Sequence, residues 1–141
     1  MFISIQHVLE KLREVVSSRG SPCSLKTFGV QLSDDLYLDG PRAVLKTEAG
    51  YKCLEVEALS EALRTLAHPA TIEERPFRTL APPYVELYED ERKYVVLGLY
   101  EGRVYMAEWS GIRLCCSWVT DIDTTAYRNA VDILKAFVED V

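Results

Sequence analysis

The feature that most constrains the fold of this chain is a series of four strand-like runs in its second half. The runs are rich in β-branched and aromatic residues, and the links that separate them are two residues each. Such links are too short for a crossover, so each run must turn back beside the one before it. The sequence therefore predicts a four-stranded antiparallel meander. Its runs are Tyr84–Glu89, Arg92–Tyr100, Arg103–Trp109 and Ile112–Val119.

Three other segments show the apolar spacing of amphipathic helices. They cover Ser4–Ser18, Glu57–Ala67 and Thr124–Glu139. Ser4 is a good N-cap for the first helix, and Gly20 is a good residue to end it. A β-hairpin with Gly50 at its turn is predicted between the first two helices.

That hairpin consists of Arg42–Thr47 and Tyr51–Val56. A short strand is predicted within residues 28–32, where Phe28, Val30 and Leu32 alternate with other residues. Pro69–Pro83 is expected to be a loop, because prolines stiffen it and remove backbone donors.

These elements predict one α+β domain over residues 1–141, with helices packed on one face of the meander and a small N-terminal hairpin. No stretch reaches the length of about 18 apolar residues that a membrane span needs. Charged residues interrupt the apolar pattern of Met1–Glu14, unlike a secretory signal. We therefore expect a cytoplasmic protein.

The meander is expected to have one aliphatic and one aromatic face. Val95, Leu97 and Leu99 alternate with Tyr94 and Tyr100, so the two sets point to opposite sides of the strand. A solvated sheet face usually carries Thr, Lys and Glu rather than aromatic rings. The residues expected on the aromatic face are Tyr84, Tyr88, Tyr94, Tyr100, Tyr105 and Trp109, with Arg92 and Arg103 beside them.

Two registers remain open at the last link, Ser110-Gly111. A two-residue loop pairs Trp109 with Ile112 and places alternate residues of Leu114–Trp118 on the aromatic face. A three-residue loop with Gly111 in the left-handed conformation places them in the core instead. In the first case both faces of the sheet are apolar, and the second face needs a cover.

The aromatic face has two interpretations. Flat rings beside arginines can stack on the bases and contact the phosphates of single-stranded DNA or RNA. In this interpretation Tyr94, Tyr100, Tyr105 and Trp109 stack on bases. Arg92 and Arg103 meet the phosphates. The net charge of −6 argues against duplex DNA as the ligand.

In the other interpretation the same face is buried in a protein–protein or homodimer interface, where Tyr and Trp are also enriched. Phe137 and Val141 of the last helix could then pack across a two-fold axis. No nucleophile, phosphate-loop or metalloprotease motif occurs, and the Asp34-Asp35 and Asp121–Asp123 carboxylates suit a turn and a helix cap. We expect no catalysis and no cofactor.

Asn and Gln together make up 3 of the 141 residues. This depletion of heat-labile amides indicates a thermophile, and we expect an archaeal one. The four cysteines form no CxxC pair, so no metal site is expected. Free thiols are expected, although a hyperthermophile cytosol would also permit Cys23 or Cys53 to pair with Cys115 or Cys116.

The order of the elements resembles that of the ThermoDBP-like single-stranded DNA-binding proteins of thermophilic archaea. The resemblance covers the Ser4–Ser18 helix, the Tyr84–Val119 meander and the Thr124–Glu139 helix. It implies a cleft with apolar and aromatic walls that holds single-stranded DNA. The long C-terminal coiled coil of some members has no counterpart up to Val141. The matching aromatic positions are Tyr94, Tyr100, Tyr105 and Trp109.

Overall fold

The predicted meander forms the middle of a larger sheet in this computed structural model, which describes residues 2–25 and 29–139. Its four strands are consecutive antiparallel neighbours. Two further strands extend it: β1 (Phe2–Ser4) lies parallel to β8, and β7 (Thr71–Arg75) lies antiparallel to β11. The predicted sheet was therefore two strands too small, and part of the predicted Pro69–Pro83 loop is strand. The meander strands are β8 (Ala81–Glu89), β9 (Tyr94–Tyr100), β10 (Arg103–Ser110) and β11 (Arg113–Thr120).

The predicted N-terminal hairpin is confirmed, but it belongs to a second, five-stranded sheet of order β2-β6-β5-β4-β3. Of the strand predicted within residues 28–32, Val30–Gln31 is β3, while Phe28 lies outside the described residues. The other strands of this sheet are β2 (Ser21–Cys23), β4 (Leu36–Asp39), β5 (Arg42–Thr47) and β6 (Gly50–Glu55).

The three predicted helices are confirmed, with ends within one residue of the expected positions. They are α1 (Ile5–Arg19), α2 (Glu57–Ala67) and α3 (Thr124–Glu139). Ser4 Oγ accepts a hydrogen bond from the His7 amide at 3.4 Å, so it caps α1 as predicted. No helix in the described part of the chain is both long and apolar enough to cross a bilayer.

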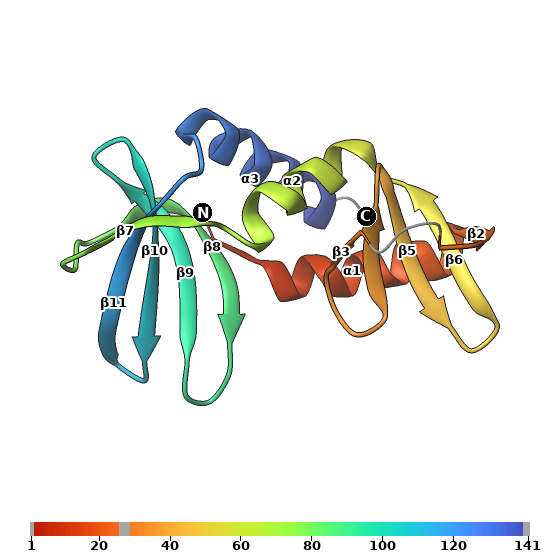
Figure 1. Ribbon diagram of the computed structural model, residues 1–141, viewed down its shortest axis with the longest axis horizontal. Coiled ribbons are helices and arrows are strands. Elements are labelled where there is room, and N and C mark those ends of the chain that lie inside the picture. Colours follow the sequence, from red (N-terminus) through yellow and green to blue (C-terminus); the bar gives the residue numbers. More distant parts are fainter. Residues whose placement is uncertain (1, 26–28, 140–141) are drawn as a thin grey trace.

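The helices lie between the two sheets, one sheet at each end of an elongated molecule (Figure 1). One buried apolar cluster includes residues of all three helices and of both sheets. Leu12 of α1, Leu38 of β4, Leu97 of β9 and Leu134 of α3 are all fully buried within it. Burial of each such side chain contributes about 1.5–3 kcal/mol. The chain is therefore an α+β protein whose sheets share one core.

The hairpin turns settle the register of the meander. Tyr100 pairs with Arg103 across Glu101-Gly102, as predicted. The last turn follows neither expected register, because Ser110 pairs with Arg113. A β-bulge next to this turn then places Trp118 opposite Met106, whose side faces the core.

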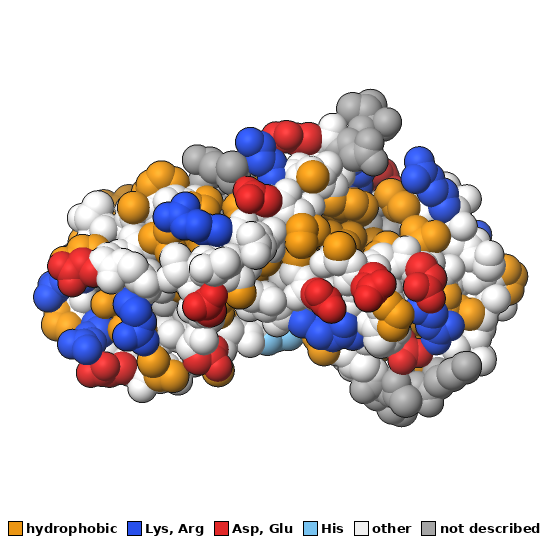
Figure 2. All heavy atoms as spheres, turned by 90° about the horizontal axis from the view of Figure 1, so that it is seen from above, with side chains coloured by type: hydrophobic (Ala, Val, Ile, Leu, Met, Phe, Trp, Pro, Cys, Tyr) orange, Lys and Arg blue, Asp and Glu red, His pale blue; other side chains and the backbone are white. Residues whose placement is uncertain are grey.

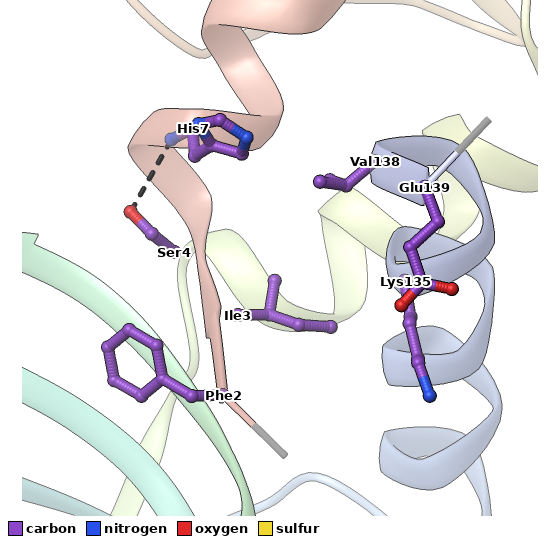
Figure 3. Close-up of a pocket in the computed structure, with 7 residues that line it drawn as sticks. All are labelled: Phe2, Ile3, Ser4, His7, Lys135, Val138 and Glu139. Atoms are coloured by element: carbon purple, nitrogen blue, oxygen red, sulfur yellow. Dashed lines mark hydrogen bonds between the residues drawn. The ribbon is translucent and has the colours of Figure 1, made fainter. Parts of the chain in front are cut away.

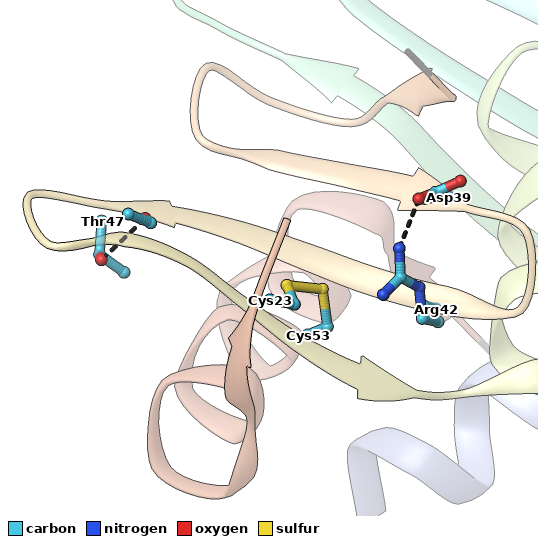
Figure 4. The surroundings of a disulfide bond; sticks show 6 residues. Cys23, Asp39, Arg42, Thr47 and Cys53 are labelled. Carbon is cyan, nitrogen blue, oxygen red and sulfur yellow. Dashed lines mark hydrogen bonds and ion pairs between the residues drawn. A yellow bond between two sulfur atoms is a disulfide. The ribbon is translucent and has the colours of Figure 1, made fainter. Parts of the chain in front are cut away.

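All four cysteines form disulfides, so the prediction of free thiols was wrong. Cys23 on β2 is bonded to Cys53 on β6, with 5.9 Å between their Cα atoms (Figure 4). β2 and β6 are antiparallel neighbours, which brings the two residues together. Cys115 and Cys116 are bonded to each other. The alternative pairing of Cys23 or Cys53 with Cys115 or Cys116 does not occur either, because β2 and β6 belong to one sheet and β11 to the other.

Candidate aromatic cavity

The predicted aromatic face exists on the side of β8–β11 that points away from the helices. We use the name aromatic face for the side that carries Tyr84, Tyr94, Tyr105 and neighbouring rings. Tyr88 does not belong to it, contrary to the prediction. A bulge in β8 pairs Tyr88 with Val95, which alternates with Tyr94 and therefore points to the other side.

A segment of the same chain, residues 76–80, crosses this face. Leu80 lies directly over Gly98, so a Cβ atom added at Gly98 would be 2.8 Å from the Leu80 Cβ. The Tyr84 hydroxyl donates a hydrogen bond to the Leu80 carbonyl at 2.8 Å. The Arg78 guanidinium lies 5.9 Å from the centre of the Tyr100 ring. The crossing segment divides the aromatic face into two ends.

At one end, the rings contact each other. Tyr100 and Tyr105 meet edge to face with 5.8 Å between ring centres. Tyr105 is only 8% exposed, so this ring cannot stack on a ligand without a rearrangement. Arg103 pairs with Tyr100 at this same end of the strands. Three of the six predicted site residues thus lie together, away from the cavity described next.

At the other end, the rings surround a solvent-open cavity of about 360 Å³, which we call the aromatic cavity. Phe77 meets Trp109 edge to face, with 6.0 Å between ring centres. The predicted residues Tyr94 and Trp109 both line it. The complete lining is Phe2, Phe77, Thr79, Leu80, Tyr84, Tyr94, Val96, Ala107 and Trp109.

Phe2 and Phe77 were not predicted as site residues. Phe2 is in a three-residue strand and Phe77 in the crossing segment, and neither place has a periodic pattern that would reveal its direction. Phe2 and Ile3 point to opposite sides of β1 (Figure 3), so Phe2 can reach the aromatic cavity while Ile3 faces α3. The side towards α3 holds a second hollow, which His7 and Lys135 also line.

The rim of the aromatic cavity carries charges of both signs. A shallow hollow shares Tyr94 and Trp109 with the cavity, and Arg92 and Lys93 line it together with acidic residues 89–91. The Lys93 ammonium lies 3.1 Å from the Glu108 carboxylate. Basic and acidic side chains are also intermixed on the face shown in Figure 2. Arg92 and Lys93 are thus exposed cations beside Tyr94 and Trp109, in a rim that also carries three acidic residues.

Two carboxylates affect the ionisation of Tyr94. Burial raises the pKa of its phenol, and the negative charges of Glu86 and Glu89 raise it further. Glu86 is itself only 7% exposed. Its burial raises the pKa of its carboxyl, and the negative charge of Glu89 raises it further. Ser4 Oγ donates a hydrogen bond to Glu86 at 3.3 Å. The Tyr94 hydroxyl therefore stays neutral and can serve as a hydrogen-bond donor at the cavity.

Comparisons of this chain with protein-family models, with curated proteins and with solved structures find no match. The function is therefore inferred from the cavity itself. An apolar cavity with aromatic walls, a neutral phenol and a cation at its rim is suited to hold a flat ring that carries an anionic substituent.

Proposed function

We propose that this chain is a non-catalytic binding protein that holds bases of single-stranded nucleic acid in the aromatic cavity. The observation that carries the proposal is the meeting of Trp109, Tyr94 and Phe77 around an open apolar space. Each base that stacks on an aromatic ring contributes about 1–3 kcal/mol. Arg92, which lines the adjoining hollow, would contact a phosphate.

We limit the proposed site to one end of the aromatic face, because the aromatic cavity lies there. Trp109 and Tyr94 line the cavity, and Arg92 lines the hollow beside it. Tyr100 and Arg103 are at the other end and are proposed only as contacts for a longer strand, while the buried Tyr105 supports the Tyr100 ring. The resemblance in layout to the ThermoDBP-like family leads to the same ligand class. The net charge of −6 leads us to expect modest affinity that depends on stacking more than on phosphates.

The test is a fluorescence-anisotropy titration of labelled single-stranded DNA and RNA of mixed sequence, run at two salt concentrations. We expect Trp109→Ala to weaken binding by about 1–3 kcal/mol without unfolding the chain. Trp118→Phe is the matched control, because Trp118 lies opposite Met106 on the other side of the sheet. Equal affinities of Trp109→Ala and the unmodified chain would refute the proposal.

A second function is favoured by a separate observation at the cavity mouth. Phe2 is 54% exposed and Phe77 is 47% exposed, and exposed rings of this size often mark protein interfaces. In this alternative a second copy of the chain covers the cavity. Light scattering after size-exclusion chromatography distinguishes the two functions. A chain that is a dimer, and that Phe77→Ala converts to a monomer, supports the interface. The predicted contribution of Val141 to a dimer lies outside the described residues.

A further inference from the structure

The bulge in the last hairpin brings two adjacent cysteines to the same place. Glu108 pairs with Cys116, and Trp109 pairs with Leu114, so Cys115 is the extra residue that has no partner in the register. Neighbouring side chains in a regular strand point to opposite faces. A bulge sets two residues against one and turns the strand locally. Here the two sulfur atoms come together and form a disulfide between adjacent residues.

A carboxylate stands beside these two sulfur atoms. The Cys116 Sγ is 4.0 Å from Glu108 Oε2. The other carboxylate oxygen, Oε1, is 3.1 Å from the Lys93 ammonium, which holds the group in this orientation. One ligand atom each from Glu108, Cys115 and Cys116 lies within 4.8 Å of the other two. Cys115 is exposed to solvent, so reagents and ions can reach the cluster.

We propose that Cys115, Cys116 and Glu108 form a redox-gated binding site for a thiophilic divalent cation such as Zn²⁺ or Cd²⁺. In the oxidised chain the two sulfur atoms of the disulfide are neutral and therefore poor ligands for a cation, because the thiolate is the form of cysteine that binds metal ions. In the reduced chain the thiolates of Cys115 and Cys116 and the carboxylate of Glu108 would bind the ion together. Soft sulfur ligands select Zn²⁺ and Cd²⁺ over Mg²⁺ and Ca²⁺, and three protein ligands leave a fourth position for water.

The gating reaction is thiol–disulfide exchange with a dithiol reductant. One sulfur atom of the reductant attacks the Cys115–Cys116 bond, and its second sulfur atom then releases the mixed disulfide. The reductant supplies two electrons and leaves with its own sulfur atoms joined, while its two protons pass to the cysteines. The cation then displaces those two protons when it binds.

The test uses the full chain with Cys23→Ser and Cys53→Ser, so that only the proposed site can supply thiolates. After treatment with a dithiol and its removal without oxygen, the chain is titrated with Cd²⁺ and the thiolate-to-cadmium absorption is recorded. We expect one ion per chain in the reduced state and none in the oxidised state. Glu108→Gln should weaken the affinity by about tenfold or more while reduction still proceeds.

Absence of the absorption band in the reduced chain, or an unchanged affinity of Glu108→Gln, would overturn the proposal. If circular dichroism finds the double serine variant unfolded, the reduced unmodified chain is used in its place. It is compared with a Cys115→Ser, Cys116→Ser chain, which keeps Cys23 and Cys53. A loss of one bound ion supports the site, and equal stoichiometry overturns it.

Discussion

The contact between Gly98 and the crossing segment leads to a sharp prediction for Gly98→Ala. The new Cβ would be 2.8 Å from the Leu80 Cβ and 3.3 Å from the Ala81 carbonyl oxygen. Carbon atoms pack at about 3.5–4.0 Å, so Leu80 must retreat by roughly 1 Å. Because the Leu80 Cβ is attached to the backbone, a rotation of the side chain cannot relieve the contact.

Overpacking of this kind costs about 1–3 kcal/mol. The replacement of glycine by alanine also lowers the conformational entropy of the unfolded chain, which stabilises the folded protein by about 0.4–1 kcal/mol. We therefore expect Gly98→Ala to lower the free energy of unfolding by roughly 1–2 kcal/mol in urea denaturation. Trp109 emission should change as well, because Phe77 in the same segment packs on that ring.

A double-mutant cycle with Leu80→Gly provides the control. If the Cβ contact causes the loss, Gly98→Ala should cost less in the Leu80→Gly background than in the unmodified chain. A Gly98→Ala chain that is as stable as the unmodified one, with unchanged Trp109 emission, would refute the idea that the crossing segment rests on Gly98.

Three further outcomes are expected. Cys53→Ser opens a disulfide to Cys23 that spans a sequence separation of 30, and it should lower the urea-derived free energy of unfolding by about 3–4 kcal/mol. Burial is the main cause that raises the pKa of Glu86, and the charge of Glu89 is the second. Because the pKa is higher in the folded chain, this group contributes stability at low pH that is lost as the pH rises through its folded pKa. Glu86→Gln should thus stabilise the chain near neutral pH and flatten that part of the Tm–pH profile. Tyr127→Phe removes the hydrogen bond from the buried Tyr127 hydroxyl to the Pro83 carbonyl, and thermal unfolding should show a loss of about 1–2 kcal/mol.

The features that the sequence predicted well depend on local interactions. The helices end within one residue of their predicted limits, because apolar spacing, the Ser4 cap and flanking turn residues act over a few residues. The pairing of Tyr100 with Arg103 was predictable for the same reason. Glu101 and Gly102 both have positive φ, at 47° and 73°, which fits the tight turn expected there.

The features that were missed depend on contacts between distant segments. β1 has three residues and β7 is exposed throughout, so neither has a pattern of its own, and each is defined by the strand beside it. The disulfide between Cys23 and Cys53 depends on the pairing of β2 with β6. The alternation of residues in the sequence also gave no sign of the two bulges. The bulge in β8 moved Tyr88 off the aromatic face, and the bulge in β11 brought the sulfur atoms of Cys115 and Cys116 together.

The sequence by itself determined that this chain has three amphipathic helices, a meander and a sheet face rich in aromatic rings. These follow from side-chain periodicity, which is a property of neighbouring residues. Only the tertiary structure decided which of those rings are available. Tyr105 is buried against Tyr100 at one end, where Arg78 of the crossing segment lies near the Tyr100 ring, and the crossing segment completes a cavity around Trp109 at the other end. Its position depends on packing between Leu80 and Gly98, residues 18 apart that no local pattern connects.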